Sequence, residues 1–114
     1  MSESGPDADV VDLVSDDYAR TILEATRDEA RSVDALSEAC DADPSTVYRR
    51  VDRLEAADLL ETEQRLDPDG HHYKAYRATL DAVHVDLGED GFTVEVERTE
   101  SPADTFTRLY EGFK

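Results

Sequence analysis

The chain has 114 residues, of which 39% are hydrophobic and 36% are charged, and its 29 acidic and 12 basic residues give a formal net charge of -17. This length is enough for one small domain and too short for two. The acidic excess argues against broad, charge-driven affinity for nucleic acid, because such affinity rests on positive charge. Any attraction to phosphate must therefore be local.

Ten of the twelve bases are arginine, and only Lys74 and Lys114 are lysine. Surplus acid with scarce lysine is typical of proteins from salt-loving microbes, where molar salt shortens the Debye length to roughly 3 Å. We interpret the acidity as adaptation to such a cytoplasm, in preference to a functional acidic tail. Cys40 is the only cysteine, so no intramolecular disulfide can form, and no apolar run approaches the roughly 20 residues of a membrane span. These features predict a cytoplasmic protein with no membrane partner.

The first half of the chain shows helical periodicity. Residues 1–9 are polar and acidic and predict a disordered leader. A helix is expected over 15–29, with Ser15 as its cap, and a short one over 33–40 after Ser32. Asp43 and Pro44 are a strong start signal for a third helix over 44–57.

After residue 59 the apolar period changes to two. Residues 60–78 predict a β-hairpin with its turn at 67–70, and residues 83–96 predict a second hairpin. A C-terminal helix is expected after Ser101, since four apolar side chains follow at helical spacing: Phe106, Leu109, Tyr110 and Phe113. The fold class is α+β, with one domain over 10–80 and a hairpin-plus-helix unit over 81–114.

The third helix concentrates basic charge. On a wheel of about 100° per residue, Val47, Val51 and Leu54 form a core stripe. The opposite sector holds Thr46 together with three arginines, Arg49, Arg50 and Arg53, and no acid of this helix falls within it. A solvated helix face is the ordinary explanation of such a pattern. Two helices joined by a short turn and followed by a hairpin, however, is the order of a winged helix-turn-helix.

The run DPSTVYRRVDRLEAADLLE, residues 43–61, resembles the recognition-helix signature of winged helix-turn-helix regulators of the ArsR type. Ser45, Thr46 and Val47 match its opening and Leu59 its close, while Asp58 replaces a usual glycine. Asp accepts a left-handed backbone better than most residues do. KAYRAT, residues 74–79, is similar to the return strand of the wing, and the later hairpin and helix resemble small haloarchaeal regulators.

The resemblance implies a homodimer that binds double-stranded DNA, with the third helix in the major groove and the hairpin on the backbone or minor groove. Carried over by position, the recognition-helix contacts would be Ser45, Thr46, Arg49, Arg50 and Arg53, and the wing contacts would be Arg65, His71, His72 and Lys74. The dimer interface is expected on the C-terminal stripe of Phe106, Leu109, Tyr110 and Phe113, with or without the second hairpin. Screening or bridging cations such as potassium would offset the acidic flanks.

Other chemistry finds little support in the sequence. Cys40 has no cysteine neighbour, and His71 and His72 adjoin in a strand and point to opposite faces, which disfavours a shared metal. No phosphate-cradling glycine loop or nucleophile elbow occurs, so neither enzyme activity nor a cofactor is expected. The main alternative is a winged-helix adaptor that docks on another protein and never binds DNA. The operator, the sense of regulation and any effector cannot be read from the sequence.

Overall fold

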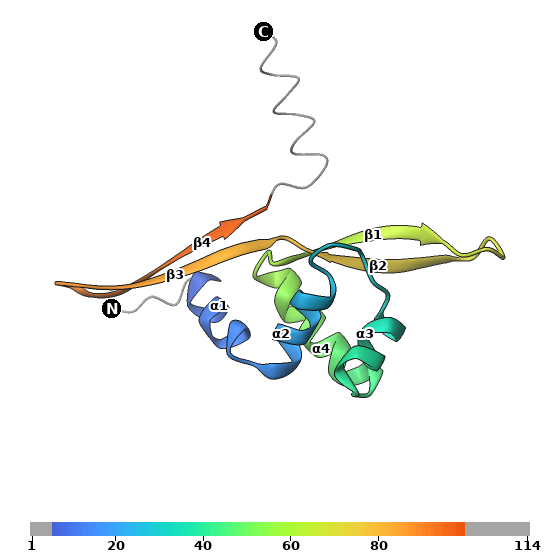
Figure 1. Cartoon of the computed structure of the whole chain (residues 1–114), viewed down its shortest axis with the longest axis horizontal. Helices are drawn as coiled ribbons and strands as arrows, with labels where there is room; N and C mark the ends of the chain where they lie inside the picture. Colours follow the sequence, from blue (N-terminus) through green and yellow to red (C-terminus); the bar gives the residue numbers. More distant parts are fainter. Residues whose placement is uncertain (1–5, 100–114) are drawn as a thin grey trace, which may run out of the picture.

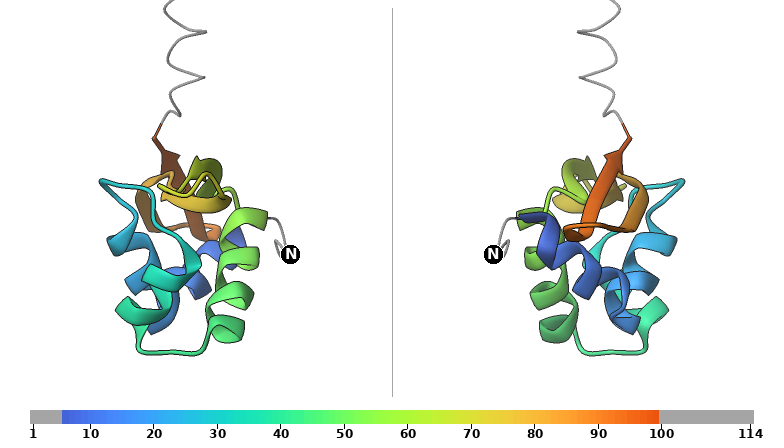
Figure 2. Two further views of the ribbon diagram at one scale, coloured as in Figure 1. Left: turned by 90° about the vertical axis from the view of Figure 1, so that its right-hand side faces the viewer. Right: turned by 90° about the vertical axis from the view of Figure 1, so that its left-hand side faces the viewer.

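The computed structural model of the chain describes residues 6–99. Four helices precede two antiparallel hairpins. The elements are α1 (Pro6–Val14), α2 (Asp17–Ala25), α3 (Val33–Cys40), α4 (Pro44–Ala56), β1 (Leu60–Leu66), β2 (His72–Ala78), β3 (Leu80–Gly88) and β4 (Gly91–Arg98). The hairpins lie end to end in one long ribbon, and the helices lie along one side of it (Figure 1; Figure 2). The α+β fold class is confirmed. The expected C-terminal helix lies outside the described residues.

The N-terminal region departs from expectation. Helix α1 begins at Pro6, so the predicted disordered leader over 1–9 is wrong for residues 6–9. Val10 and Leu13, one helical turn apart, are both fully buried. Burial of this stripe stabilises a helix that its acidic composition alone would not favour.

Helix α2 is shorter than the predicted 15–29. Its N-cap is Asp16, whose carboxylate accepts a hydrogen bond from the backbone N–H of Ala19 at 2.9 Å, in place of the expected Ser15. It ends at Ala25 because the following chain turns back to the sheet. Arg31 exchanges two backbone hydrogen bonds with Tyr76 of β2, so this segment extends beside the hairpin.

The α3–α4 pair follows the sequence prediction closely. Ser32 caps α3 through a hydrogen bond from the backbone N–H of Ala35, and Asp41 ends that helix in a left-handed conformation with φ of 52°. Helix α4 starts at Pro44 as predicted, although the Asp43 side chain makes no capping hydrogen bond. The three-residue turn between them fixes how α4 crosses α3.

One apolar cluster holds the helices to the ribbon. Its buried members are Val10, Leu13, Ala19, Ile22, Leu23, Val33, Leu36, Val47, Val51, Leu54, Ala57, Leu59, Leu60, Tyr76 and Ala78, and the second hairpin adds Val83 and Val96 at its edge. The predicted core stripe of α4 is therefore confirmed. Both hairpins share this core, the first through Leu60 of β1 and Tyr76 and Ala78 of β2, and the second through its base.

The C-terminal end of α4 meets both hairpins at one junction. Asp58 adopts φ of 62°, the left-handed conformation that its replacement of a glycine suggested. The Arg98 guanidinium of β4 donates hydrogen bonds to the carbonyl oxygens of Ala57 and Asp58, each at 2.9 Å. The Thr79 hydroxyl also donates to the Asp58 carbonyl, at 3.2 Å. A cation at the carbonyl end of a helix is favourable to its dipole, so Arg98 both caps α4 and fixes the second hairpin to it.

We predict that Arg98→Ala lowers the free energy of unfolding by about 1.5 kcal/mol, because two hydrogen bonds from a charged donor are lost. Chemical denaturation monitored by circular dichroism measures the effect. Arg27→Ala is the control, since its ion pair with Asp28 is 78% and 86% exposed and should contribute little. Equal effects of the two substitutions would contradict this role for Arg98.

Candidate nucleic-acid interface

Helix α4 turns one face inward and presents the other to solvent. Val47, Val51 and Leu54 are buried against α2 and α3, as the wheel requires. On the outer side Ser45, Arg49 and Arg53 are exposed, while Thr46 and Arg50 are partly covered. The sequence-predicted recognition residues therefore do share the outward side of α4, but they differ in how they are held.

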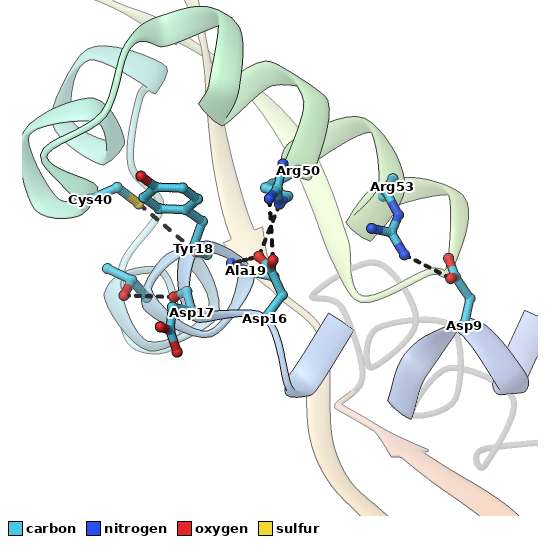
Figure 3. A network of polar contacts seen from close by, with 9 residues as sticks. Asp9, Asp16, Asp17, Tyr18, Ala19, Cys40, Arg50 and Arg53 are labelled. Atoms are coloured by element: carbon cyan, nitrogen blue, oxygen red, sulfur yellow. Dashed lines mark hydrogen bonds and ion pairs between the residues drawn. The ribbon is translucent and has the colours of Figure 1, made fainter. Parts of the chain in front are cut away.

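Arg50 is bound to the start of α2. Its guanidinium donates two hydrogen bonds to the Asp16 carboxylate, at 2.9 and 3.2 Å, and lies 5.5 Å from the centre of the Tyr18 ring (Figure 3). The hydrogen bond from Arg50 is the main reason that the pKa of Asp16 lies below its ordinary value, and the same bond raises the pKa of Arg50. Both side chains are only about a quarter exposed, at 25% and 26%. Arg50 therefore links α4 to the N-terminus of α2.

Arg53 is bound to α1. Its guanidinium donates to the Asp9 carboxylate at 2.8 Å, and the two side chains are 45% and 46% exposed (Figure 3). The expectation that no acid of α4 itself lies among its arginines holds, but two acids from outside α4, Asp9 of α1 and the α2 cap Asp16, pair with them. A half-exposed pair of this kind is weak and sensitive to salt, so Arg53 can be released at small cost.

Arg49 differs from its two neighbours. It is exposed, and across residues 6–99 no acidic side chain forms an ion pair with it. It lies one helical turn from both Ser45 and Arg53, on the exposed side of α4. Of the three arginines, Arg49 is therefore the one whose guanidinium fork is available to a guanine edge or a phosphate without breaking an internal contact.

The wing divides the predicted contacts between its two faces. The register pairs Leu66 with His72 and Gln64 with Lys74, which places these four side chains on one face. That face continues to Thr62, whose hydroxyl donates to Glu55 of α4, so it is the face turned toward α4. His72 and Lys74 are thus brought together beside the recognition helix.

Arg65 and His71 are not part of that group. Arg65 lies on the opposite face of the wing, and its guanidinium donates to the Glu63 carboxylate at 3.0 Å. The same carboxylate accepts a hydrogen bond from Arg77 at 3.5 Å. His71 belongs to the turn, where its backbone N–H donates to the Asp67 carboxylate at 2.8 Å. The four predicted wing contacts are therefore not all brought together: His72 and Lys74 share the face toward α4, Arg65 lies on the opposite face, and His71 lies in the turn.

The wing tip also holds a cluster that the sequence reading missed. The ligand atoms of Asp67, Asp69 and His71 all lie within 4.8 Å of one another. The backbone N–H groups of Asp69 and His71 both donate to one Asp67 oxygen, so the turn itself accounts for this proximity. From the sequence, only His71 with His72 was considered as a metal pair and was disfavoured, and the two aspartates of the turn were not considered.

Two hollows flank α4. One, of about 430 Å³, lies between α3, α4 and the wing and is lined by Ser32, Val33, Asp34, Tyr48, Gln64, His72, Tyr73, Lys74 and Tyr76. The other, of about 580 Å³, lies at the helix-turn-helix turn and is lined by Tyr18, Ser37, Glu38, Asp41, Ala42, Asp43 and Thr46. Three acids in the second hollow surround the N-terminus of α4. They oppose the attraction that a helix N-terminus has for phosphate.

A protein-family model described as a helix-turn-helix domain matches residues 14–63. Residues 14–63 form a helix-turn-helix domain. The match runs from the end of α1 into β1, and the β1–β2 hairpin completes a winged helix. DNA-binding domains of this kind place the second helix of the motif in the major groove. In this chain the second helix of the motif is α4. No curated protein sequence matches the chain.

Two further features of the helix-turn-helix domain bear on other functions. Cys40 is half-buried, its Sγ lies 3.9 Å from the Tyr18 carbonyl oxygen, and burial raises the pKa of its thiol. It is therefore protonated at neutral pH and a weak nucleophile. Among residues 6–99, no helix has the length and apolar character needed to cross a bilayer.

We predict that Asp16→Asn destabilises the protein by about 1.5 kcal/mol at pH 7, because Asn keeps the cap but loses the charged partner of Arg50. The folded pKa of Asp16 is depressed, so its contribution is present above the unfolded pKa of about 3.9 and is lost as the pH falls through the folded value. The difference between wild type and variant should therefore shrink at acid pH, as measured by urea denaturation between pH 7 and 3.

Asp12→Asn is the matched control. Asp12 is exposed, and its side chain makes no ion pair within residues 6–99. A difference for Asp16→Asn that stays constant across this pH range would show that the charge of Asp16 is not what stabilises the fold.

Proposed function

We propose that the protein is a sequence-specific DNA-binding transcription regulator that acts as a homodimer. In this proposal α4 enters the major groove and the β1–β2 wing lies on the backbone or in the minor groove. The observation that carries it is the exposure of Arg49 on the outer face of α4, in the recognition-helix position of a helix-turn-helix domain. The resemblance to ArsR-type regulators and to small haloarchaeal proteins supports the same function.

The α4 contacts of the proposal follow from how each side chain is held. Arg49 reads a base edge through its bidentate fork, and Ser45 and Thr46 contact phosphate or bases near the start of α4. Arg53 joins them when its exposed pair with Asp9 opens. Arg50 keeps its pair with Asp16 and positions α4 without touching DNA.

The wing contributes phosphate contacts. Lys74 and His72 lie on the face turned toward α4 and are the proposed contacts. Arg65 and His71 face elsewhere and have internal partners in Glu63 and the turn, so we assign them no more than a secondary part.

Salt decides whether the local attraction prevails over the surrounding acid. The acids at the N-terminus of α4 and the net charge of -17 repel phosphate in dilute solution. Molar potassium screens both that repulsion and the pair that holds Arg53. A high-salt cytoplasm is therefore part of the proposed function, with potassium as the screening or bridging cation.

Dimerisation is assigned to residues 81–114. The apolar stripe of Phe106, Leu109, Tyr110 and Phe113 lies outside the described residues, so its part in the dimer remains a sequence-based proposal. Operators with dyad symmetry require a two-fold symmetric protein, which is why a self-associating surface belongs to the proposed function.

The second candidate function is a protein-binding adaptor. Two of the three arginines of α4 already have internal partners, and the surroundings are acidic, which weakens the case for phosphate as the partner. An adaptor would use α4 or the apolar part of the second hairpin to contact another protein.

Selection from a random duplex DNA pool at about 2 M KCl separates the two functions. We predict enrichment of a dyad-symmetric site, and a loss of roughly 10- to 100-fold in affinity per half-site on Arg49→Ala, because one bidentate base contact is removed from each half-site. Arg27→Ala, which removes an exposed arginine outside α4, should bind as wild type. A folded protein that enriches no sequence would favour the adaptor.

Salt dependence gives an independent prediction. Affinity for the selected duplex should hold or rise between 0.2 and about 2 M KCl, measured by fluorescence anisotropy, whereas binding driven by counterion release falls steeply. Asp9→Asn should raise affinity roughly twofold to fivefold at low salt, since it frees Arg53 and removes a repulsive charge, and should change little at high salt. Asp12→Asn removes an equal charge without freeing an arginine. A steep loss of wild-type affinity with salt would contradict the proposal.

A further inference from the structure

The β3–β4 hairpin has one entirely apolar face. Its register pairs Val83 with Val96, Val85 with Val94, and Leu87 with Phe92, and directly opposed residues share a face. Val83 and Val96 pack against the core of the domain, and the face then runs outward past the helices (Figure 1). Its outer part is exposed, with Val85 at 50%, Leu87 at 71% and Phe92 at 72%.

The other face of the same hairpin is polar. It carries His84, Asp86, Thr93, Glu95 and Glu97, and a ring nitrogen of His84 lies 2.9 Å from the Glu97 carboxylate. The alternation is therefore that of a sheet with one face covered and one face in water. A two-stranded hairpin is marginal on its own, so the outer half gains little from the chain that carries it.

We propose that a second copy of this chain covers this face, hairpin on hairpin, about a two-fold axis. The inference rests on the homodimer of the proposed function and names its interface. A two-fold contact uses the same patch on both copies, and a regular row of paired valine, leucine and phenylalanine side chains is complementary to itself. Phe92 and Leu87 are also the two most exposed large apolar side chains of residues 6–99.

The position of the hairpin fits this role. The wing lies at one end of the ribbon and β3–β4 at the other, with the helices between them (Figure 1). A dimer joined at β3–β4 therefore leaves α4 and the wing of each copy uncovered. Arg98 connects β4 directly to the end of α4, so the interface would also fix the relative placement of the two recognition helices.

The exposed apolar face of the hairpin is smaller than the area that a stable dimer interface buries. Because the core covers Val83 and Val96, only the outer four residues of each strand, 85–88 and 91–94, offer a free face, roughly 13 by 10 Å or about 130 Å² per copy. A stable dimer buries about 800 Å² per partner. The proposal therefore takes its further apolar surface from the stripe of Phe106, Leu109, Tyr110 and Phe113, which lies outside the described residues.

The mass in solution, measured by light scattering at 0.2 and about 2 M KCl without DNA, tests the interface separately from DNA binding. We expect wild type at twice the chain mass, Phe92→Asp as a folded monomer, and Thr93→Asp, one residue away on the polar face, still as a dimer. Leu87→Asn should weaken the dimer in the same way as Phe92→Asp, and circular dichroism confirms folding of each variant.

Two outcomes would overturn the inference. A wild-type monomer would mean that another segment of the chain covers the face or that it stays open. A wild-type dimer that survives both Phe92→Asp and Leu87→Asn would place the interface elsewhere. In either case DNA selection still decides the proposed function, since it measures sequence enrichment and not mass.

Discussion

The bidentate pair between Asp16 and Arg50 is the contact on which the arrangement of the domain depends. It joins the N-cap of α2 to the middle of α4, with the Tyr18 ring beside the guanidinium, and it is the least exposed ion pair in which α4 takes part. Because one carboxylate both caps a helix and holds an arginine, the cap and the crossing of α2 and α4 cannot change independently. The Asp16 carboxylate thus orients α4 from the side that carries the three arginines. Arg50 is engaged in this pair, so we do not assign it a contact with DNA.

The three arginines of α4 form a gradation in availability. Arg50 is held by a partly buried pair, Arg53 by an exposed one, and Arg49 by no acid of residues 6–99. In the proposed function, this gradation makes the affinity for DNA depend on the salt concentration. Salt weakens exposed ion pairs and long-range repulsion more than it weakens partly buried contacts. The net charge of -17 and the basic face of α4 are then parts of one salt-dependent mechanism. At the far end of the ribbon, β3–β4 leaves apolar side chains exposed, and we propose that a second copy covers them.

Local signals in the sequence predicted what depends on neighbouring residues. The Ser32 cap predicted the start of α3, and Asp43 with Pro44 predicted the start of α4. The period-two pattern predicted both hairpins. The pairing of the arginines could not be predicted this way, because Asp16 and Asp9 lie 34 and 44 residues from their partners along the chain. Helix α1 was missed for a related reason, since its short apolar stripe is stabilised only by the core it joins. The placement of Arg65 on one face of the wing and of His72 and Lys74 on the other, by contrast, follows from the alternation of side chains along paired strands.

Nuclear magnetic resonance of the arginine Nε–H groups, during titration with the selected duplex at about 2 M KCl, tests the central claim most directly. The account predicts that the Arg49 signal shifts strongly and the Arg53 signal moves as its pair with Asp9 opens, while the Arg50 signal stays that of the free protein. Bound DNA that leaves the Arg49 signal unchanged, or that displaces Arg50 from Asp16, would contradict the proposed use of α4.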